Sequence, residues 1–402
     1  MRAYFDHAAT SPLTDEVLGT YTDELRRIGN ASSQHAEGQA ARVRLESARR
    51  RLAQAVGAEP AQVVFTSGGT EADNLAVKGI HAARLAQDPR RTRVLVSTIE
   101  HHAILESAEH LESRGATIEW LEVDRAGRVD PQVVADVIAR DPETVSLVSV
   151  MLANNEIGTV QPIARIAQIA HAHDIPVHTD AVQALGQVPV DFATLGVDAL
   201  SITAHKVGGP VGVGALVLSR TLAPVPVLHG GGQERSVRSG TLDVAGAAAF
   251  AHAAERATAR LTDGTTARMA ALRDRLAAGL LDTVPDAVLT GGDLDGDIDG
   301  LPARLPGNVH VVLPGCEGAS LLFLLDAAGF ATSTGSACQA GVARPSHVLL
   351  ACGFDEEQSR SAQRFTLGPE TTQQQVDALL AALPEAVERS RQAGLVGAGG
   401  AR

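Results

Sequence analysis

The chain has 402 residues, of which 45% are hydrophobic and 20% charged, and its mean hydropathy is close to zero. This composition is typical of a globular protein with enough apolar residues for a sizeable core, and the length suggests two or three domains. The net charge of −13 disfavours tight binding to a phosphate backbone, so we expect no direct nucleic-acid partner.

Signals for export and membrane insertion are not evident in the sequence. The first residues, MRAYFDHAAT, contain no apolar run, and the apolar stretch that begins at Leu321 is short and is interrupted by Asp326. Three cysteines, Cys316, Cys338 and Cys352, are too few for a disulfide framework and fit a reducing compartment. We therefore expect a cytoplasmic protein with no membrane span.

Apolar, β-rich runs alternate with helical patterns from about residue 62 to residue 220. In chain order, the pattern predicts a strand from Gln62, a helix from Thr70, a strand at 93–100, a helix from His102, a strand at 144–152, a helix at 163–173, and strands from Ile175, Asp198 and Gly214. Continuous apolar strands that alternate with helices predict an α/β fold with a mostly parallel sheet flanked by helices. Ligands of such sheets bind beyond the carboxyl ends of the strands.

A different pattern follows residue 243. Ala-rich helical segments extend to about residue 282. A shorter mixture comes next: NVHVVL from Asn308, ASLLFLLDAAG from Ala319, QRFTLG from Gln363 and a last helix at about 372–393. This half of the chain predicts a smaller α+β domain.

The segment TSGGTEADN, from Thr66, combines a strand end, two glycines and a helix start. The free backbone amides and the helix dipole at such a turn attract anions, and Thr70 could cap the helix or bind a phosphate. An ordinary capped turn has the same pattern. The phosphate-site interpretation therefore depends on what else lies at this edge of the sheet.

A carboxylate and an amine are predicted at the same edge. Asp180 follows the strand IPVHT, and Lys206 follows DALSIT; the only other lysine is Lys78. A lysine amine can form a Schiff base, and a carboxylate beside a pyridine nitrogen keeps that ring protonated and able to accept electrons. Together with the phosphate turn, the pair favours a pyridoxal phosphate (PLP) site over a capping Asp and a surface Lys.

Further polar residues flank these positions. His101, or equally His102 on local evidence, could stack on a flat ring or carry a proton. Thr203 and His205 could reach the phosphate, and Gln183 could bond to the phenolic oxygen of the ring.

Cys338 and Arg364 are candidates for substrate chemistry. Cys338 lies among small residues in STGSACQAG, where a thiolate could act as a nucleophile, although a free Cys often packs as a small apolar residue. Arg364 could pair with a substrate carboxylate. We interpret Cys316 and Cys352 as structural.

One cluster imitates a metal site. HAHDIPVHTD places His171, His173, His178 and Asp180 close together in sequence. The first two histidines fall late in a predicted helix, so we expect no metal site.

The ordered set of motifs resembles the cysteine desulfurases, which are PLP enzymes of the class V aminotransferase group; the nitrogenase-type and iron–sulfur-cluster-type enzymes are the most similar. The shared segments run almost from end to end: YFDHAATSPL, NASSQHAEG, FTSGGTEADNLAVKG, EHHAIL, NNEIGTVQPI, HTDAVQALG, TAHKVGGPVGVG, GGGQERSVRSGTL, LPGNV, EGASLL, GSAC and RFTLG.

The resemblance implies a PLP enzyme of fold type I that forms a homodimer. A large PLP-binding domain would span residues 14–255. A small domain would combine residues 1–13 with 256–402 and carry a Cys loop at about 333–345.

The resemblance also implies a role for each matching residue. Lys206 would hold the cofactor covalently, Asp180 would pair with its pyridine nitrogen, and His101 would stack on its ring. The phosphate would be held by Gly69, Thr70, Thr203 and His205, and by Thr241 from the other subunit. Gln183 would bond to the cofactor oxygen, Asn155 and Arg364 would contact the substrate, and Cys338 would receive the sulfur.

The implied reaction is the removal of sulfur from L-cysteine, which gives L-alanine and a persulfide on Cys338 for transfer to acceptor or scaffold proteins. The destination of the sulfur, such as iron–sulfur clusters, thio-cofactors, tRNA or DNA, stays open. Alternatives at this point are a selenocysteine lyase, another class V aminotransferase or lyase, a sulfur-transfer scaffold without activity, and a metal hydrolase.

Overall fold

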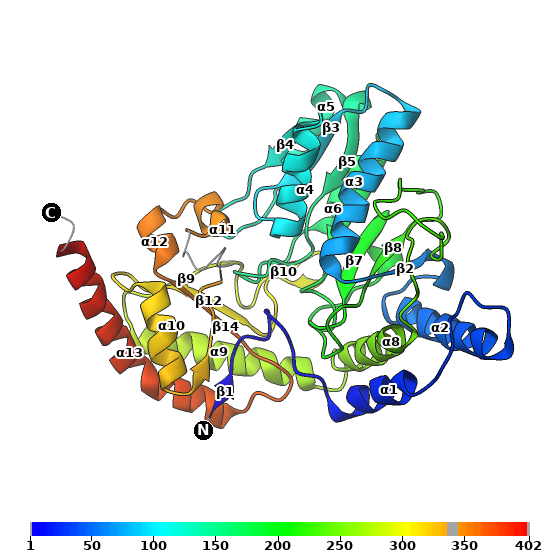
Figure 1. Ribbon diagram of the computed structural model, residues 1–402. Helices are drawn as coiled ribbons and strands as arrows, with labels where there is room; N and C mark the ends of the chain where they lie inside the picture. The colour runs from blue at the N-terminus through cyan, green and yellow to red at the C-terminus, as the bar shows by residue number, and fades with distance from the viewer. Residues whose placement is uncertain (1, 336–344, 400–402) are drawn as a thin grey trace.

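A seven-stranded sheet forms the centre of the larger part of the molecule (Figure 1). The structure is a computed structural model that describes residues 2–335 and 345–399. In spatial order the strands are β2 (Val63–Thr66), β8 (Gly214–Leu218), β7 (Ala199–Thr203), β6 (Val177–Asp180), β5 (Val145–Ser149), β3 (Arg93–Ser97) and β4 (Thr117–Leu121). Only β8 runs antiparallel to its neighbours, so the predicted mostly parallel sheet is confirmed.

Helices cover both faces of this sheet. On one face lie α3 (Gly69–Gln87) and α4 (His102–Glu112). On the other lie α2 (Ala36–Ala55), α5 (Pro131–Arg140), α6 (Ile163–His171), α7 (Phe192–Leu195) and α8 (Val244–Ala259), with α1 (Asp15–Leu25) packed against α8. Two short 3-10 turns, Pro60–Gln62 and Pro142–Thr144, precede β2 and β5.

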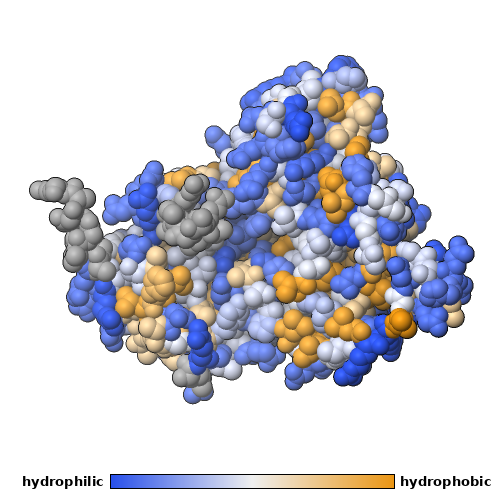
Figure 2. Space-filling view, in the orientation of Figure 1, coloured by the Kyte–Doolittle hydropathy of each residue, from blue (hydrophilic) through white to orange (hydrophobic). Residues whose placement is uncertain are grey.

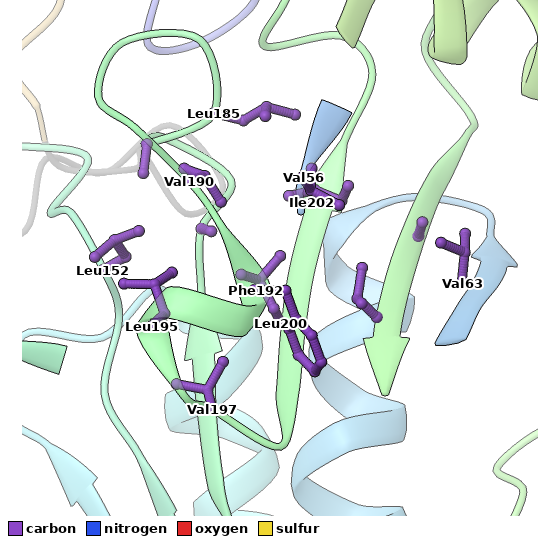
Figure 3. Close-up of a cluster of buried hydrophobic side chains, with 14 of the residues drawn as sticks. Val56, Val63, Leu152, Leu185, Val190, Phe192, Leu195, Val197, Leu200 and Ile202 are labelled. Carbon is purple, nitrogen blue, oxygen red and sulfur yellow. The ribbon is translucent and has the colours of Figure 1, made fainter. Parts of the chain in front are cut away.

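Successive residues of the central strands contribute to opposite faces. In β7, Ala199 packs toward α3 and α4, whereas Leu200 and Ile202 pack on the other side with Val197 and Phe192 (Figure 3). Side chains alternate along a strand with a period of two. Both faces of the sheet are covered, so both sets must be apolar, which explains the continuous apolar runs in the sequence.

Some elements were not predicted. β4 is an edge strand whose residues are mostly accessible to solvent, so TIEWL carries no apolar run. The helix α2 is rich in arginine and buries only a narrow set of positions, including Leu45 and Leu52. Neither element has the continuous hydrophobicity on which the prediction depended.

A second, three-stranded antiparallel sheet lies on the left in Figure 1. Its strands, in order, are β14 (Ala362–Thr366), β12 (Asn308–Val312) and β9 (Val288–Leu289). Around it are α9 (Thr265–Thr283), α10 (Gly318–Ala327), α11 (His347–Ala351), α12 (Glu356–Arg360) and α13 (Gln373–Gly399). Short pairs are formed by β10 (Asp297–Ile298) with β11 (Leu301–Pro302), and by β1 (Ala3–Tyr4) with β13 (Phe330–Ala331).

Each sheet has a main hydrophobic core of its own, and a smaller cluster joins Ile99 and Met151 to Val312 of β12. The second core combines β12 and β14 with α9, α10, α13 and the N-terminal Phe5. This separation supports a division into residues 14–255 and residues 1–13 with 256–402, which stays a prediction.

Hydrophilic residues predominate on the face shown in Figure 2, with apolar residues over α10 and near α1 and α8. Phe323, on α10, is 72% exposed. Of the helices within residues 2–335 and 345–399, none combines the length and the apolar character needed to cross a membrane.

The core that covers β7 is expected to be sensitive to loss of volume. Leu200 is fully buried in it, so Leu200→Ala should lower the free energy of unfolding by about 2–5 kcal/mol. Leu25→Ala, at a leucine that is 60% exposed, is the control and should lower it by less than about 1 kcal/mol. Urea denaturation followed by circular dichroism measures both changes; equal midpoints for the two variants would contradict the assignment of this core.

Candidate active site

A cavity of about 610 Å³ lies at the carboxyl ends of the central strands. The ends of β6 and β7 and the starts of α3 and α4 form one side, and β14 and the N-terminal segment form the other. Nearly all residues predicted from the sequence line it: Gly69, Thr70, His101, Asn155, Asp180, Gln183, Thr203, His205, Lys206 and Arg364. A volume of this size is ordinary for a site that holds a small organic ligand.

Lys206 projects its amine into this cavity from the loop after β7. Its Nζ donates to the backbone oxygens of Ala8, at 2.5 Å, and Ala9, at 2.9 Å. Burial and the nearby Arg364 lower the pKa of Lys206 to about 8, against the opposing effect of Asp180 and Asp6. A larger share of the amine is therefore neutral near physiological pH than for a lysine in water.

Asp180 ends β6, next to β7 in the sheet, and is 5% exposed. Its Oδ1 accepts the Val182 N–H at 2.8 Å. Burial raises the pKa of Asp180 to about 6, although the Val182 amide and Lys206 act in the opposite direction. A carboxylate with so little solvent is stabilised by a cationic partner in the cavity.

The N-terminus of α3 opens onto the same cavity. Gly68 precedes the helix with φ +154° and provides no side-chain cap, and Gly69 and Thr70 line the cavity. Uncapped amides at the start of a long helix, together with its dipole, suit a phosphate group. The side chain of Thr203 lies nearby, with its Oγ1 donating to the Val213 carbonyl at 3.2 Å.

Two histidines of the cavity are held in their neutral form. His101 caps α4, with its Nδ1 accepting the Ala103 N–H at 3.1 Å. Burial, followed by the charge of Lys206, lowers the pKa of His101 to about 4, and the same two causes lower that of His205 to about 4. A neutral imidazole can both accept and donate a proton.

Arg364 enters from β14 and is 5% exposed. Its Nη1 donates to the backbone oxygen of Asn155, and its Nη2 donates to Asp6 Oδ1, each at 2.8 Å. Gln183, by contrast, directs its amide to the oxygen of Ala8, at 2.9 Å. The guanidinium is therefore the cavity's candidate group for an anionic substrate.

Two predicted residues are not part of this cavity as described. Thr241 is exposed and lines a separate small cavity with Thr66 and Ser67. Cys338 lies outside the described residues. Cys316 and Cys352 are free and buried, and burial raises the pKa of Cys352 to about 12, which fits the structural role predicted for them.

Several cavity residues were missed in the sequence. Asp6 and Glu156 line the cavity, as do Asp73 and His347. Burial and the charge of Asp180 raise the pKa of Asp73 well above its usual value. Asp6 and Asp73 fall inside segments that resemble the family, but no local pattern distinguishes them from ordinary polar residues.

The histidine cluster does not form a metal site in the part of the chain that the structure describes, where no three candidate ligands come together. His171 bonds to Asp198 at 2.7 Å. His178 is buried in the sheet between the hydroxyls of Ser149 and Ser201, each at 2.9 Å.

Comparisons with known proteins agree with this geometry. The aminotransferase class-V family matches residues 3–379. An IscS-like cysteine desulfurase of Mycobacterium tuberculosis (strain ATCC 25618 / H37Rv) is 48% identical over 401 residues, which cover 100% of both chains. A cysteine desulfurase IscS of Methanosarcina thermophila is 41% identical over 96% of this chain and 92% of its own.

Solved structures of similar fold indicate the same family. A NifS-like protein superposes with a TM-score of 0.87 at 33% identity, covering 96% of this chain and all of its own. SspA in complex with cysteine superposes with a TM-score of 0.76 at 30% identity, covering 92% of this chain and 100% of that one. The chain therefore belongs to the aminotransferase class-V family, whose members are PLP enzymes, and within it to the cysteine desulfurases.

Proposed function

We propose that the protein is a PLP-dependent cysteine desulfurase that converts L-cysteine to L-alanine and leaves the sulfur as a persulfide on Cys338. The observation that carries this proposal is the meeting of a desolvated lysine amine, a buried carboxylate and a buried guanidinium in one cavity. The names of its full-length relatives and the cysteine-bound SspA structure support the same substrate.

Three features of the cavity fit PLP. Asp180 is a buried carboxylate suited to a protonated pyridine nitrogen, the uncapped start of α3 suits the phosphate, and the amine of Lys206 suits the aldehyde. When bound, PLP supplies an electron-accepting ring that stabilises negative charge on the α-carbon of the substrate.

Lys206 would remove the proton from that α-carbon and would later return one to it, so that the product is L-alanine. Its desolvated Nζ has lost part of its affinity for a proton, so the amine can act as a base near neutral pH. The carbonyls of Ala8 and Ala9 hold the amine on the side of the cavity next to Gln183.

Arg364 and Asn155 would bind the α-carboxylate of the substrate, which leaves its thiol directed toward the rest of the cavity. His101, neutral at physiological pH, would carry protons beside the reacting carbon.

Cys338 would accept the sulfur. It lies three residues after Gly335 in the sequence, and Gly335 lines the cavity. In the transfer the Cys338 thiolate attacks the substrate sulfur. A sulfur–sulfur bond forms, the bond from sulfur to the β-carbon breaks, and its electron pair is protonated to give the methyl group of alanine.

A homodimer and a cytoplasmic location are part of the proposal. Thr241 lies outside the cavity of its own chain, which suits a role toward a second copy. Large apolar side chains that a second copy could cover are Ile28, Val43 and Val211. The acceptor of the persulfide is proposed only as a class: a sulfur-carrier or scaffold protein.

The two lysines provide a direct test of the cofactor site. Lys206→Ala should abolish the visible absorption of protein-bound PLP, because no other cavity residue carries a primary amine. Lys78→Ala is the matched control, since Lys78 bonds to Asn74 on α3, and its spectrum should equal that of the wild type. A Lys206→Ala protein that shows the same bound-PLP absorption as the wild type after PLP is added would refute the assignment.

The lowered pKa of Lys206 predicts how fast the cofactor-free protein captures PLP. Only the neutral amine attacks an aldehyde, so the capture rate should rise as pH increases through about 8 and level off above it. Stopped-flow absorbance from pH 6.5 to 10.5 measures this rate. A rate that keeps rising to pH 10, as for a lysine in water, would show that the amine is not desolvated.

The cysteines separate cofactor binding from sulfur transfer. Cys338→Ser should retain the absorption of bound PLP but form no persulfide. With a thiol reductant present to free sulfide from the persulfide, it should release at least about 100-fold less sulfide from L-cysteine, because the attacking group is a thiolate. Cys352→Ser, at a buried cysteine whose pKa is raised to about 12, should keep cysteine turnover. Mass spectrometry detects the persulfide; wild-type sulfide release by Cys338→Ser would exclude this nucleophile.

A further inference from the structure

The N-terminal segment forms part of the cavity wall. In Figure 1 its blue trace leaves β1 in the left-hand unit, rises to the middle of the molecule and then descends to α1. Asp6 bridges to Thr366 of β14, and the Thr366 N–H donates to the oxygen of Phe5 at 2.7 Å. Two residues later, Ala8 holds the amine of Lys206. Backbone bonds therefore fix Asp6 between the second sheet and the reacting groups.

The carboxylate of Asp6 is one of two groups that orient Arg364. Its Oδ1 lies 2.8 Å from Nη2, and the side chains of Asp6 and Arg364 are only 20% and 6% exposed. The oxygen of Asn155 takes a hydrogen from Nη1. The two acceptors come from different parts of the chain and together fix the plane of the guanidinium. Within the described residues, the buried Nε has no hydrogen-bond partner.

The position of Asp6 is maintained at an electrostatic cost. Burial raises the pKa of the Asp6 carboxyl, although Arg364 acts to lower it. A partly buried carboxylate with one good hydrogen bond to an arginine does more to orient the guanidinium than to stabilise the fold. Because a guanidinium binds a carboxylate best in a defined planar geometry, its orientation determines how well it receives an anionic ligand.

We propose that Asp6 is a positioning residue for substrate binding: it holds the guanidinium of Arg364 so that the free N–H groups face the α-carboxylate of an amino-acid substrate. The inference rests on the proposed function for the identity of that amino acid. In this proposal, the hydrogen-bond acceptor at Asp6 controls substrate affinity, and its negative charge does not.

Three substitutions of Asp6 separate these two properties. Asp6→Ala removes the acceptor, and Asp6→Glu keeps the charge but moves the acceptor by one methylene group. Both should raise KM for L-cysteine about 10-fold, with kcat changed less than about threefold, because the orientation of Arg364 affects ground-state and transition-state binding alike. Asp6→Asn keeps an acceptor at the same distance and removes repulsion toward the substrate carboxylate, so its KM should equal that of the wild type or be lower.

Asp326→Ala is the matched control. It removes another aspartate–arginine pair, between Asp326 and Arg2, with a distance of 2.8 Å. The side chain of Asp326 is 52% exposed and that of Arg2 is 75% exposed, so this substitution should leave KM unchanged. The absorption of bound PLP and the thermal midpoint confirm that each variant is folded and loaded. If Asp6→Ala does not fold, Asp6→Glu and Asp6→Asn still decide the question.

Either of two results would overturn the proposal: a KM for Asp6→Glu equal to that of the wild type, or a KM for Asp6→Asn raised as much as the KM for Asp6→Glu. Calorimetric titration of the PLP-loaded protein with L-alanine provides the second readout, and its dissociation constant should change in parallel with KM. If the wild type does not release sulfur from L-cysteine, the proposed function fails, but the L-alanine titration still tests Asp6 by itself.

Discussion

A lysine amine removed from bulk water at the carboxyl edge of a parallel sheet is the feature on which the remaining chemistry depends. Lys206 is useful because burial lowers its pKa to about 8, which frees the amine to react near neutral pH. The sheet places it: β6 and β7 are parallel neighbours, so Asp180, which ends β6, and Lys206, which follows β7, meet at one edge. Asp180 limits the cost of placing a cation there, and the carbonyls of Ala8 and Ala9 receive its hydrogens.

The cavity also brings together two pairs of opposite charges from different parts of the fold. Asp6 faces Arg364, and Asp180 lies near Lys206. An isolated ion would be expensive in such a place, and removal of one partner leaves the other uncompensated. The charged groups therefore position one another. The fold alone does not specify a reaction; the function follows from this set of side chains and from full-length similarity to cysteine desulfurases.

Much of the central architecture could be predicted because it is encoded locally. Strands covered on both faces must be apolar throughout, so β3, β5 and β7 appear as runs in the sequence. The edge strand β4, whose residues are mostly accessible to solvent, was missed. The turn before α3 was predicted from its two glycines, and Lys206 was selected because lysine is scarce in the chain.

The sequence by itself determined the residue types of the site and their order: a glycine turn, an acid and an amine, each just after an apolar strand. Strand direction converts that order into proximity, so these residues could be grouped in advance. Only the tertiary structure decided which distant residues complete the cavity. Asp6 and Arg364 are separated by 358 positions, and no local periodicity connects them; they meet because the N-terminal segment crosses from β1, beside the second sheet, to the ends of the central strands. Their pairing depends on the path of the N-terminal segment between the two sheets, which local sequence patterns do not predict.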